Sequence, residues 1–412
     1  MSLKIDQMLQ ILLAAAAAWL MLGASPAVGA DKPRARDLGI PFDGSPGKWN
    51  AITDVPGVEV GYTTIIRGDG VHAARTGVTV IFPRGKADYD PVFAAWAPLN
   101  GVGEMTGVGI VQEEGLLEGP VSTTNSLSVG TVRDAISKWM VQTWTWTEIC
   151  CLPVVAETHD GYLNDIASFF VREGDVFHAI QTAASGPLKE GNVGGGTGMT
   201  VYGFKGGVGT SSRVVEGIWG RYTVGVLVQA NCGERDQLRI AGVEVGRELA
   251  AAEHPHVALD PKLDREQGSI IITIATDAPL LPHQLVRLAK RAANGLARTG
   301  SINDDLSGDI AIAFSTANHG LVGVSTPTEE ALEKAPVSKV DMLPGSHIDA
   351  FFTAVTEATE ESLINALIAA DTMTGYKGHR VEAIDHGKVQ ELLRFHRMLV
   401  ENGSDAAPRA GQ

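Results

Sequence analysis

A serine at the start of a predicted strand is the most informative feature of this chain. Ser269 follows Gly268 and opens an apolar, β-branched run to residue 276, a composition typical of a buried strand. The polar segment 260–267 precedes the pair, so both residues lie where a loop meets a strand. Cleavage between them would create an N-terminal serine with a hydroxyl nucleophile and an amine of reference pKa about 8. Loop-bound Gly-Ser pairs are also common in turns, so the dipeptide alone does not decide.

A second polar unit, Ser307-Gly308-Asp309, precedes another predicted strand, 310–315. In an extended segment residues 307 and 309 project to the same side, so a hydroxyl and a carboxylate can converge on one bound nucleophile. A polar turn before the strand is the alternative interpretation.

Three other features invite cofactor or metal interpretations. The glycine-rich stretch 191–198 lacks the Lys-Ser ending of a phosphate loop and the surroundings of a dinucleotide site, so close backbone packing beside the active site is expected. His254 and His256 have no evident third ligand. The cysteines show neither metal-ligand spacing nor a disulfide framework, and they are interpreted as small core residues: Cys150, Cys151 and Cys232. We therefore predict no cofactor and no metal.

The elements that must position these residues alternate between strand-like and helix-like patterns. Strands are predicted at 57–62, 77–82, 107–112, 223–229, 269–275 and 310–315, and helices at 129–140, 241–252, 282–298, 354–370 and 387–400. Paired sheets with outer helix layers fit this mixture, although other layered α/β arrangements fit it too. No linker or repeat divides the chain, so one large α/β domain is expected, with 317–346 as a surface loop and candidate lid.

The N-terminus and the charge restrict location and partners. Residues 1–30 combine Lys4, a short apolar core and a small-residue site before Asp31, a pattern typical of a cleaved secretory signal. The apolar stretch of about 12 residues is shorter than a membrane span of about 20. We therefore expect a periplasmic or secreted protein that is free of the membrane once the signal is removed, with an uncleaved anchor as the alternative. The formal net charge of −15 argues against nucleic acid as a partner.

Seven blocks in order resemble the family of L-aminopeptidase/D-Ala-esterase/amidases and β-peptidyl aminopeptidases. They are LNGVGEMTG (99–107), TTNSLSVG (123–130), VAETHDGYLND (155–165), GNVGGGTGM (191–199), VQAN (228–231), ATDAPLLPHQL (275–285) and SGD (307–309). The resemblance covers nearly all of the mature chain. It implies a four-layer α/β/β/α sandwich of the N-terminal-nucleophile kind, a fold shared with the ornithine acetyltransferase type.

The resemblance also implies roles for individual residues. Ser269 matches the serine at which family members cleave themselves, with Gly268 before the scissile bond, and Ser307 and Asp309 match a Ser-Gly-acid unit. Family members carry glutamate at the acid position, and Asp309 is one methylene shorter. Asn231 matches a residue that helps to hold the oxyanion, where one amide donor is worth about 3–4 kcal/mol.

Substrate recognition is expected from the block 155–165. A carboxylate and a phenol there suit a substrate ammonium and an acyl oxygen, and we favour Glu157 and Tyr162 for these roles. His159 competes with Tyr162 for the place of the family's tyrosine.

The predicted function is a serine-type aminopeptidase that cleaves itself into an α chain, 31–268, and a β chain, 269–412. It would release N-terminal residues from short peptides, amides or esters, with L-, D-alanyl or β-amino-acyl groups as candidates, and would form a homo-oligomer of processed α/β heterodimers. The alternatives are an acyltransferase of the ornithine acetyltransferase type, although that type typically cleaves before threonine, and a non-enzymatic exported binding protein of the same fold.

Overall fold

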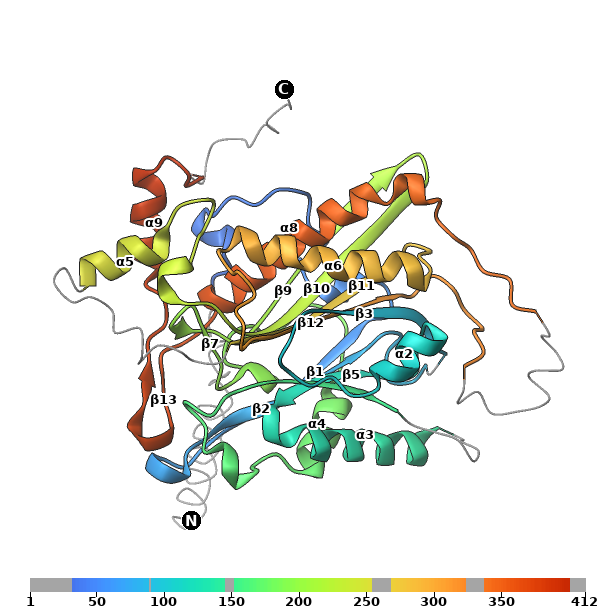
Figure 1. The fold of residues 1–412 in the computed structure, drawn as a ribbon, viewed down its shortest axis with the longest axis horizontal. Helices are drawn as coiled ribbons and strands as arrows, with labels where there is room; N and C mark the ends of the chain where they lie inside the picture. The colour runs from blue at the N-terminus through green and yellow to red at the C-terminus, as the bar shows by residue number, and fades with distance from the viewer. Residues whose placement is uncertain (1–31, 89, 145–151, 254–267, 324–336, 401–412) are drawn as a thin grey trace, which may run out of the picture. The chain divides into compact units, whose positions relative to one another are not determined.

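Two β-sheets lie face to face between two layers of helices (Figure 1). The computed structural model describes residues 32–88, 90–144, 152–253, 268–323 and 337–400, and Arg34–Gln412 groups into one compact unit. The predicted signal 1–30, Cys150, Cys151, His254 and His256 lie outside the described residues. Among those described, no helix has the length and apolar character needed to cross a membrane.

The larger sheet has six strands and carries the residues of interest at one end. Its strand order is β4 (Leu116–Leu117), β3 (Val92–Gly101), β12 (Gly308–Ser315), β11 (Ser269–Thr276), β10 (Gly220–Asn231) and β9 (Val208–Gly217). The β11–β12 pair is parallel, whereas the other pairs in this sheet are antiparallel.

The smaller sheet has four strands, in the order β1 (Glu59–Arg67), β2 (Ala74–Phe82), β5 (Val121–Asn125) and β6 (Val154–Thr158). Two short hairpins stand apart from both sheets: β7 (Thr200–Val201) with β8 (Phe204–Lys205), and β13 (Met373–Thr374) with β14 (Arg380–Val381).

Helices cover the outer face of each sheet (Figure 1). The six-stranded sheet is covered by α6 (Pro282–Arg298) and α8 (Asp349–Ile368), and the four-stranded sheet by α3 (Val129–Thr143) and α4 (Glu173–Thr182). Three shorter helices are α2 (Val108–Glu114), which packs on β3, and α5 (Val245–Glu253) and α9 (His386–Phe395), which contact each other. This arrangement confirms the four-layer α/β/β/α prediction.

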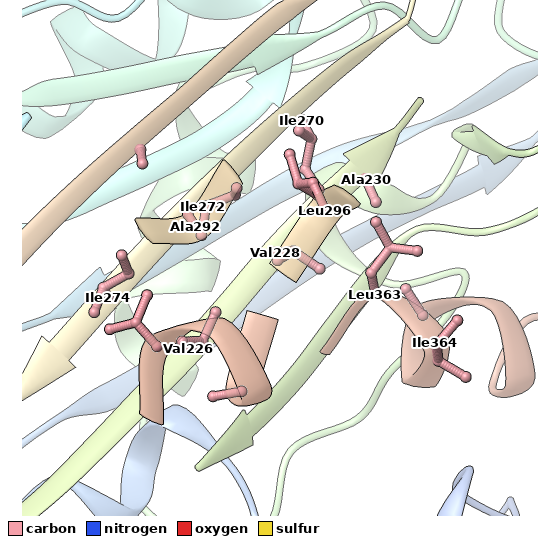
Figure 2. Close-up of a cluster of buried hydrophobic side chains, with 14 of the residues drawn as sticks. Val226, Val228, Ala230, Ile270, Ile272, Ile274, Ala292, Leu296, Leu363 and Ile364 are labelled. Atoms are coloured by element: carbon pink, nitrogen blue, oxygen red, sulfur yellow. The ribbon is translucent and has the colours of Figure 1, made fainter. Parts of the chain in front are cut away.

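Three buried clusters explain the layers, and β11 shows how one strand serves two of them. Ile270, Ile272 and Ile274 pack toward α6 and α8, as Figure 2 shows, together with Leu296 and Leu363. Ile271 and Ala275, on the alternate positions of the strand, belong to the cluster between the two sheets. Because side chains alternate along a strand, a strand covered on both faces is apolar throughout. Ser269 is the first residue of β11, on the alternation that faces the other sheet.

Most predicted elements are confirmed, with bounds that shift by a few residues. The helix predicted at 282–298 has those bounds, with Pro282 in its first turn. The strand predicted at 107–112 is wrong, because this segment forms α2, flanked by left-handed Gly107 and Gly115. A short apolar run does not distinguish a strand from a buried helical turn.

The glycine-rich segment packs backbone to backbone, as predicted. A Cβ on Gly195 would lie 2.0 Å from Gln229 Oε1 of β10 and 2.7 Å from Thr123 O of β5. A Cβ on Gly196 would lie 2.5 Å from Val208 N. Glycine is therefore required here because the chain runs between strands of both sheets.

Candidate active site

Strand register brings three of the predicted residues together at one end of the six-stranded sheet. Ser269, the first residue of β11, pairs with Asn231, the last residue of β10. On its other side Ser269 pairs with Gly308, the first residue of β12, and Gly308 pairs with Gly101 of β3. Residues far apart in sequence thus become neighbours through hydrogen bonds of the sheet.

The Ser269 hydroxyl lies against the peptide bond that precedes it. Its Oγ donates to Gly268 O at 2.6 Å, and the Gly308 N–H lies 3.2 Å from both the Ser269 Oγ and Gly268 O. Only 5% of Ser269 is exposed. A buried hydroxyl is therefore held beside the carbonyl group that a self-cleavage reaction would attack.

Ser307 and Asp309 form the pair that their spacing predicts. Ser307 Oγ donates to Asp309 Oδ1 at 2.5 Å, and Asp309 is 1% exposed. Burial raises the pKa of Asp309 to about 6, against the hydrogen bond from Ser307, which lowers it, and with a smaller contribution from the charge of Asp304. Most of the shift is therefore the cost of placing a charge away from water.

The Ser307–Asp309 pair lies beside Gly268 rather than in hydrogen-bonded contact with the Ser269 hydroxyl. Among the described residues, no hydrogen bond joins the Ser269 hydroxyl to Ser307 or Asp309. Instead, Ser307 Oγ lies 3.3 Å from where a Cβ on Gly268 would be. In the uncleaved chain the pair is therefore placed beside the peptide between residues 268 and 269, and glycine at 268 keeps that approach open.

Asn231 is held in one orientation by three contacts. Its Oδ1 accepts from Thr200 N at 2.8 Å and from Thr200 Oγ1 at 3.2 Å, and its Nδ2 donates to His159 O at 3.0 Å. Because a backbone N–H can only donate, Thr200 N identifies which end of the carboxamide is oxygen. The Nδ2 end is therefore the donor end of the carboxamide.

Glu157 is the penultimate residue of the buried strand β6 and is 8% exposed. Its Oε1 accepts from Glu104 N at 3.2 Å, and its Oε2 accepts from Ser126 Oγ. A Cβ on Gly103 would lie 3.3 Å from Glu157 Oε1 and 3.0 Å from Gly308 Cα. The Gly103 backbone thus lies between the carboxylate and the strand end that carries Gly308.

His159 and Tyr162 occupy different surroundings. The His159 carbonyl accepts from Asn231, so this residue joins the site through its backbone. The Tyr162 ring is 41% exposed and stacks on His379 of the β13–β14 hairpin, with 4.4 Å between ring centroids. The structure therefore brings His159, rather than the favoured Tyr162, into hydrogen-bonded contact with the oxyanion candidate.

Two further residues at the site were not assigned a role from the sequence. Asp160 is 1% exposed, its Oδ1 accepts from Asn164 Nδ2 at 2.9 Å, and burial raises its pKa to about 7. Asn100 donates from Nδ2 to Ser307 O at 2.6 Å and to Asp304 O at 2.8 Å. Both lie in blocks rich in polar residues, and nothing in their spacing singles them out.

A metal centre finds no support in the described part of the chain, where no group of three or more His, Cys, Asp or Glu side chains is arranged to hold an ion. Cys232 is buried, and burial raises the pKa of its thiol.

Comparison with known proteins places the fold and the family. The chain is 48% identical over 395 residues to a β-peptidyl aminopeptidase, BapA, of Sphingosinicella microcystinivorans, covering 93% of this chain and 96% of that protein. A second β-peptidyl aminopeptidase BapA, from Sphingosinicella xenopeptidilytica, is 47% identical over 88% of this chain and 91% of its own length.

Two solved structures agree closely with this one. A β-aminopeptidase of Burkholderia sp. has a TM-score of 0.80 at 46% identity, over 88% of this chain and 99% of its own. The L-aminopeptidase D-Ala-esterase/amidase of Ochrobactrum anthropi has a TM-score of 0.81 at 44% identity, over 89% of this chain and 100% of its own. The latter is described as a prototype of the serine aminopeptidases and a new variant of the Ntn hydrolase fold.

The match to peptidase family S58 spans residues 50–381, which include every candidate residue described above. Together with the shared four-layer fold, it shows that this chain belongs to peptidase family S58 and is a peptide-bond hydrolase.

Proposed function

We propose that this protein is a serine-type aminopeptidase that activates itself by cleaving the bond between Gly268 and Ser269. The observation that carries the proposal is the buried Ser269 Oγ, 2.6 Å from the oxygen of the preceding carbonyl. The products would be an α chain that ends at residue 268 and a β chain that begins with Ser269. The new amine and the hydroxyl of Ser269 then share one residue, so the amine can serve as base for its own nucleophile.

Ser307 and Asp309 are proposed to move protons for Ser269. Asp309 accepts from Ser307 at 2.5 Å, and Ser307 Oγ lies 3.3 Å from where a Cβ on Gly268 would be, so the pair lies beside the residue that precedes Ser269. A carboxylate whose pKa is about 6 is ionised at neutral pH, yet close enough to neutrality to accept and return a proton. The aspartate acts through Ser307, which compensates for its shorter side chain.

Asn231 and Glu157 are proposed to bind the substrate. The fixed Asn231 carboxamide would donate to the oxyanion of the acyl intermediate. Glu157 accepts hydrogen bonds from neutral donors and forms no ion pair among the described residues, so a substrate ammonium would supply its missing charge. A free amino terminus is thereby selected.

The substrates are proposed to be short peptides, amides or esters with a free amino group. The relatives named as β-peptidyl aminopeptidases and as an L-aminopeptidase D-Ala-esterase/amidase support β-amino-acyl, L- and D-alanyl derivatives as the first compounds to assay. Export through the predicted signal 1–30 and assembly into a homo-oligomer are part of this proposal. Fractionation of cells and light scattering would test these two points.

Mass spectrometry of the purified protein tests the central claim. We expect two chains that separate at Ser269, and we expect Ser269→Ala to remain one intact chain without hydrolytic activity, because processing and turnover use the same hydroxyl. Ser211→Ala is a matched control, since Ser211 is a buried serine of β9 that donates to Ala358 O. A Ser269→Ala protein that still splits between 268 and 269 would overturn the proposal, as would a wild-type chain that stays whole while active.

A further inference from the structure

The first hydrogen bond of the parallel β11–β12 ladder ends on the carbonyl of the scissile bond. Gly308 N–H donates to Gly268 O at 3.2 Å. In a parallel pair, a residue's N–H reaches the carbonyl one place before its register partner, and the partner of Gly308 is Ser269. Pairing of the two strands therefore aims this N–H at the scissile carbonyl without any side chain.

We propose that the Gly308 N–H is the oxyanion donor of self-cleavage. The proposal rests on Ser269 being the nucleophile. Ser269 Oγ bonds to the Gly268 carbonyl carbon, its proton passes through Ser307 to Asp309, and the C=O electron pair moves onto Gly268 O. The Gly308 N–H stabilises that negative oxygen.

Collapse of this intermediate completes an acyl shift from nitrogen to oxygen. The oxygen reforms its double bond, the bond from the Gly268 carbon to the Ser269 nitrogen breaks, and that nitrogen takes up the proton and leaves as an amine. Water then hydrolyses the resulting ester, giving a Gly268 carboxylate and restoring the Ser269 hydroxyl. The balance is one peptide bond and one water consumed, with no other reactant.

The donor is held rigidly from the other end of its own peptide group. Gly308 N and Ser307 O belong to one peptide plane, and Asn100 Nδ2 donates to that oxygen at 2.6 Å. A hydrogen bond at the carbonyl polarises the peptide and strengthens its N–H as a donor. Donors fixed before the reaction cost no reorganisation when charge develops, which is why such groups lower barriers effectively.

Close packing explains why residue 308 is glycine. A Cβ there would lie 2.7 Å from Val102 O and 2.8 Å from Gly103 Cα. A larger residue would push the start of β12 away from these atoms and displace its N–H from Gly268 O. At the register partner Gly101 there is nothing within 4 Å of an added Cβ.

The two oxyanion candidates thus serve different steps. Gly308 N–H acts on the chain's own carbonyl, whereas the Asn231 carboxamide is proposed to act on substrate. Substitutions of Gly308 should therefore lower the rate of self-cleavage more than they lower the turnover of enzyme that is already cleaved. Asn231→Ala should do the reverse. A purely structural role for Gly308 would lower both rates together.

The decisive experiment replaces one backbone N–H with oxygen in the full chain. Gly308→glycolate removes only that N–H, and we expect the first-order rate at which the 269–412 chain appears to fall about 10²–10³-fold. The matched control replaces Ile312 by its α-hydroxy analogue, which removes another N–H on the same side of β12, and should change the rate by less than about threefold. Equal rates for Gly308→glycolate and wild type would overturn the inference and leave Ser269 as the nucleophile.

Two encodable variants keep the test decisive if the ester chain does not fold. Gly308→Ala, checked for folding by circular dichroism, should slow self-cleavage by about tenfold or more, because its Cβ displaces the donor. Gly101→Ala should cleave like wild type. A folded Gly308→Ala protein that cleaves at the wild-type rate would overturn the inference, whereas a wild-type chain that never cleaves would overturn the proposed function instead.

Discussion

Two sets of buried carboxylates in this protein have opposite surroundings. Glu361 of α8 is fully buried, and both Arg36 Nη2 and Arg213 Nη2 lie 2.8 Å from its Oε2. Asp309 is buried to the same degree, but its hydrogen bond comes from the neutral hydroxyl of Ser307. No cation pairs with Asp309 among the described residues.

The pKa values follow this difference. Burial alone would raise the pKa of Glu361, but the hydrogen bond from Arg36 and the charges of Arg213 and Arg36 hold it below its ordinary value. Burial without a cation raises the pKa of Asp309 to about 6 and that of Asp160 to about 7. The same cost of burial is thus offset by cations in one region and left in place in the other.

The locations of the two sets show what each does. Glu361 ties Arg36 of the N-terminal segment and Asn50 to the helix that covers the large sheet, so its role is structural. Asp309 lies beside Ser269, and Asp160 lies in the turn that follows Glu157. Carboxylates left without a cation at one end of a sheet cost stability, and a protein retains such groups where they react or bind.

The largest expected effect is loss of turnover in Asp309→Asn. An amide does not accept the proton that Ser307 relays, so the rates of self-cleavage and of hydrolysis should fall about 10²–10⁴-fold while the fold stays intact. The measurements are the rate of chain cleavage and kcat for an amino-acid p-nitroanilide. Asp305→Asn, on the exposed turn before Ser307, is the matched control. A variant within about threefold of wild type would reduce Asp309 to a turn residue.

Removing the negative charge of Glu361, which pairs with two arginines, should instead lower stability. Glu361→Gln removes the nearer anion of the buried Arg213 and leaves it with Glu357 at 3.4 Å, so the free energy of unfolding should fall by about 3–5 kcal/mol, with kcat of the folded, cleaved enzyme unchanged. Denaturant unfolding and kinetics at low temperature measure the two quantities. Glu360→Gln breaks the neighbouring pair with the 41% exposed Arg298 side chain, and should cost about 1 kcal/mol or less. Similar losses in both variants would remove the distinction between the fully buried pair and the partly exposed pair of Arg298 with Glu360.

Glu157 extends this comparison of buried carboxylates, because the cation proposed to pair with it is the ammonium group of the substrate. N-acetylation removes the ammonium and leaves Glu157 unpaired, so acetyl-alanine p-nitroanilide should react about 10²-fold or more slowly than the free amine at equal concentration. Glu157→Gln should narrow this preference. Glu104→Gln is the control, since only its backbone N–H contacts Glu157. Equal rates on both substrates would indicate an amidase or transferase without an amine site.

Much of the fold could be predicted from the sequence because its pattern is local. An apolar, β-branched run identified β11, and helical spacing from Pro282 identified α6. The strand predicted at 107–112 was wrong because a short apolar run fits a strand and a buried helical turn equally well. Only the packing of Val111 into the core favours the helix. Strand order was beyond reach, since β12 also pairs with β3, which lies more than 200 residues earlier in the chain.

Residue type and family pattern together singled out Ser269, Asn231 and Asp309 as site candidates, and the structure places them at one end of the large sheet, while their roles stay predictions. The site was not predictable where the backbone contributes, because the Gly308 N–H and the His159 carbonyl have no sequence signature. Tyr162 was favoured for its phenol, yet its ring stacks on His379 of a hairpin more than 200 residues away in sequence. Such long-range contacts decide which polar residue of a block enters the site.

The smallest expected effect is a difference in how stability depends on pH. Asp309 and Asp160 hold protons more tightly folded than unfolded, so stability should fall by about 1–3 kcal/mol as the pH rises from about 4, their ordinary pKa, through their folded pKa values of about 6 and about 7. Glu361 has a lowered pKa, so its contribution is lost in the opposite direction, as the pH falls below its ordinary range. Unfolding free energies measured from about pH 3 to 8 should therefore peak at about pH 4. Asp160→Asn should flatten the alkaline side and Glu361→Gln the acid side. A profile whose alkaline side is unchanged in both Asp160→Asn and Asp309→Asn would show that these carboxylates reach solvent in solution, and the contrast between the two regions would be lost.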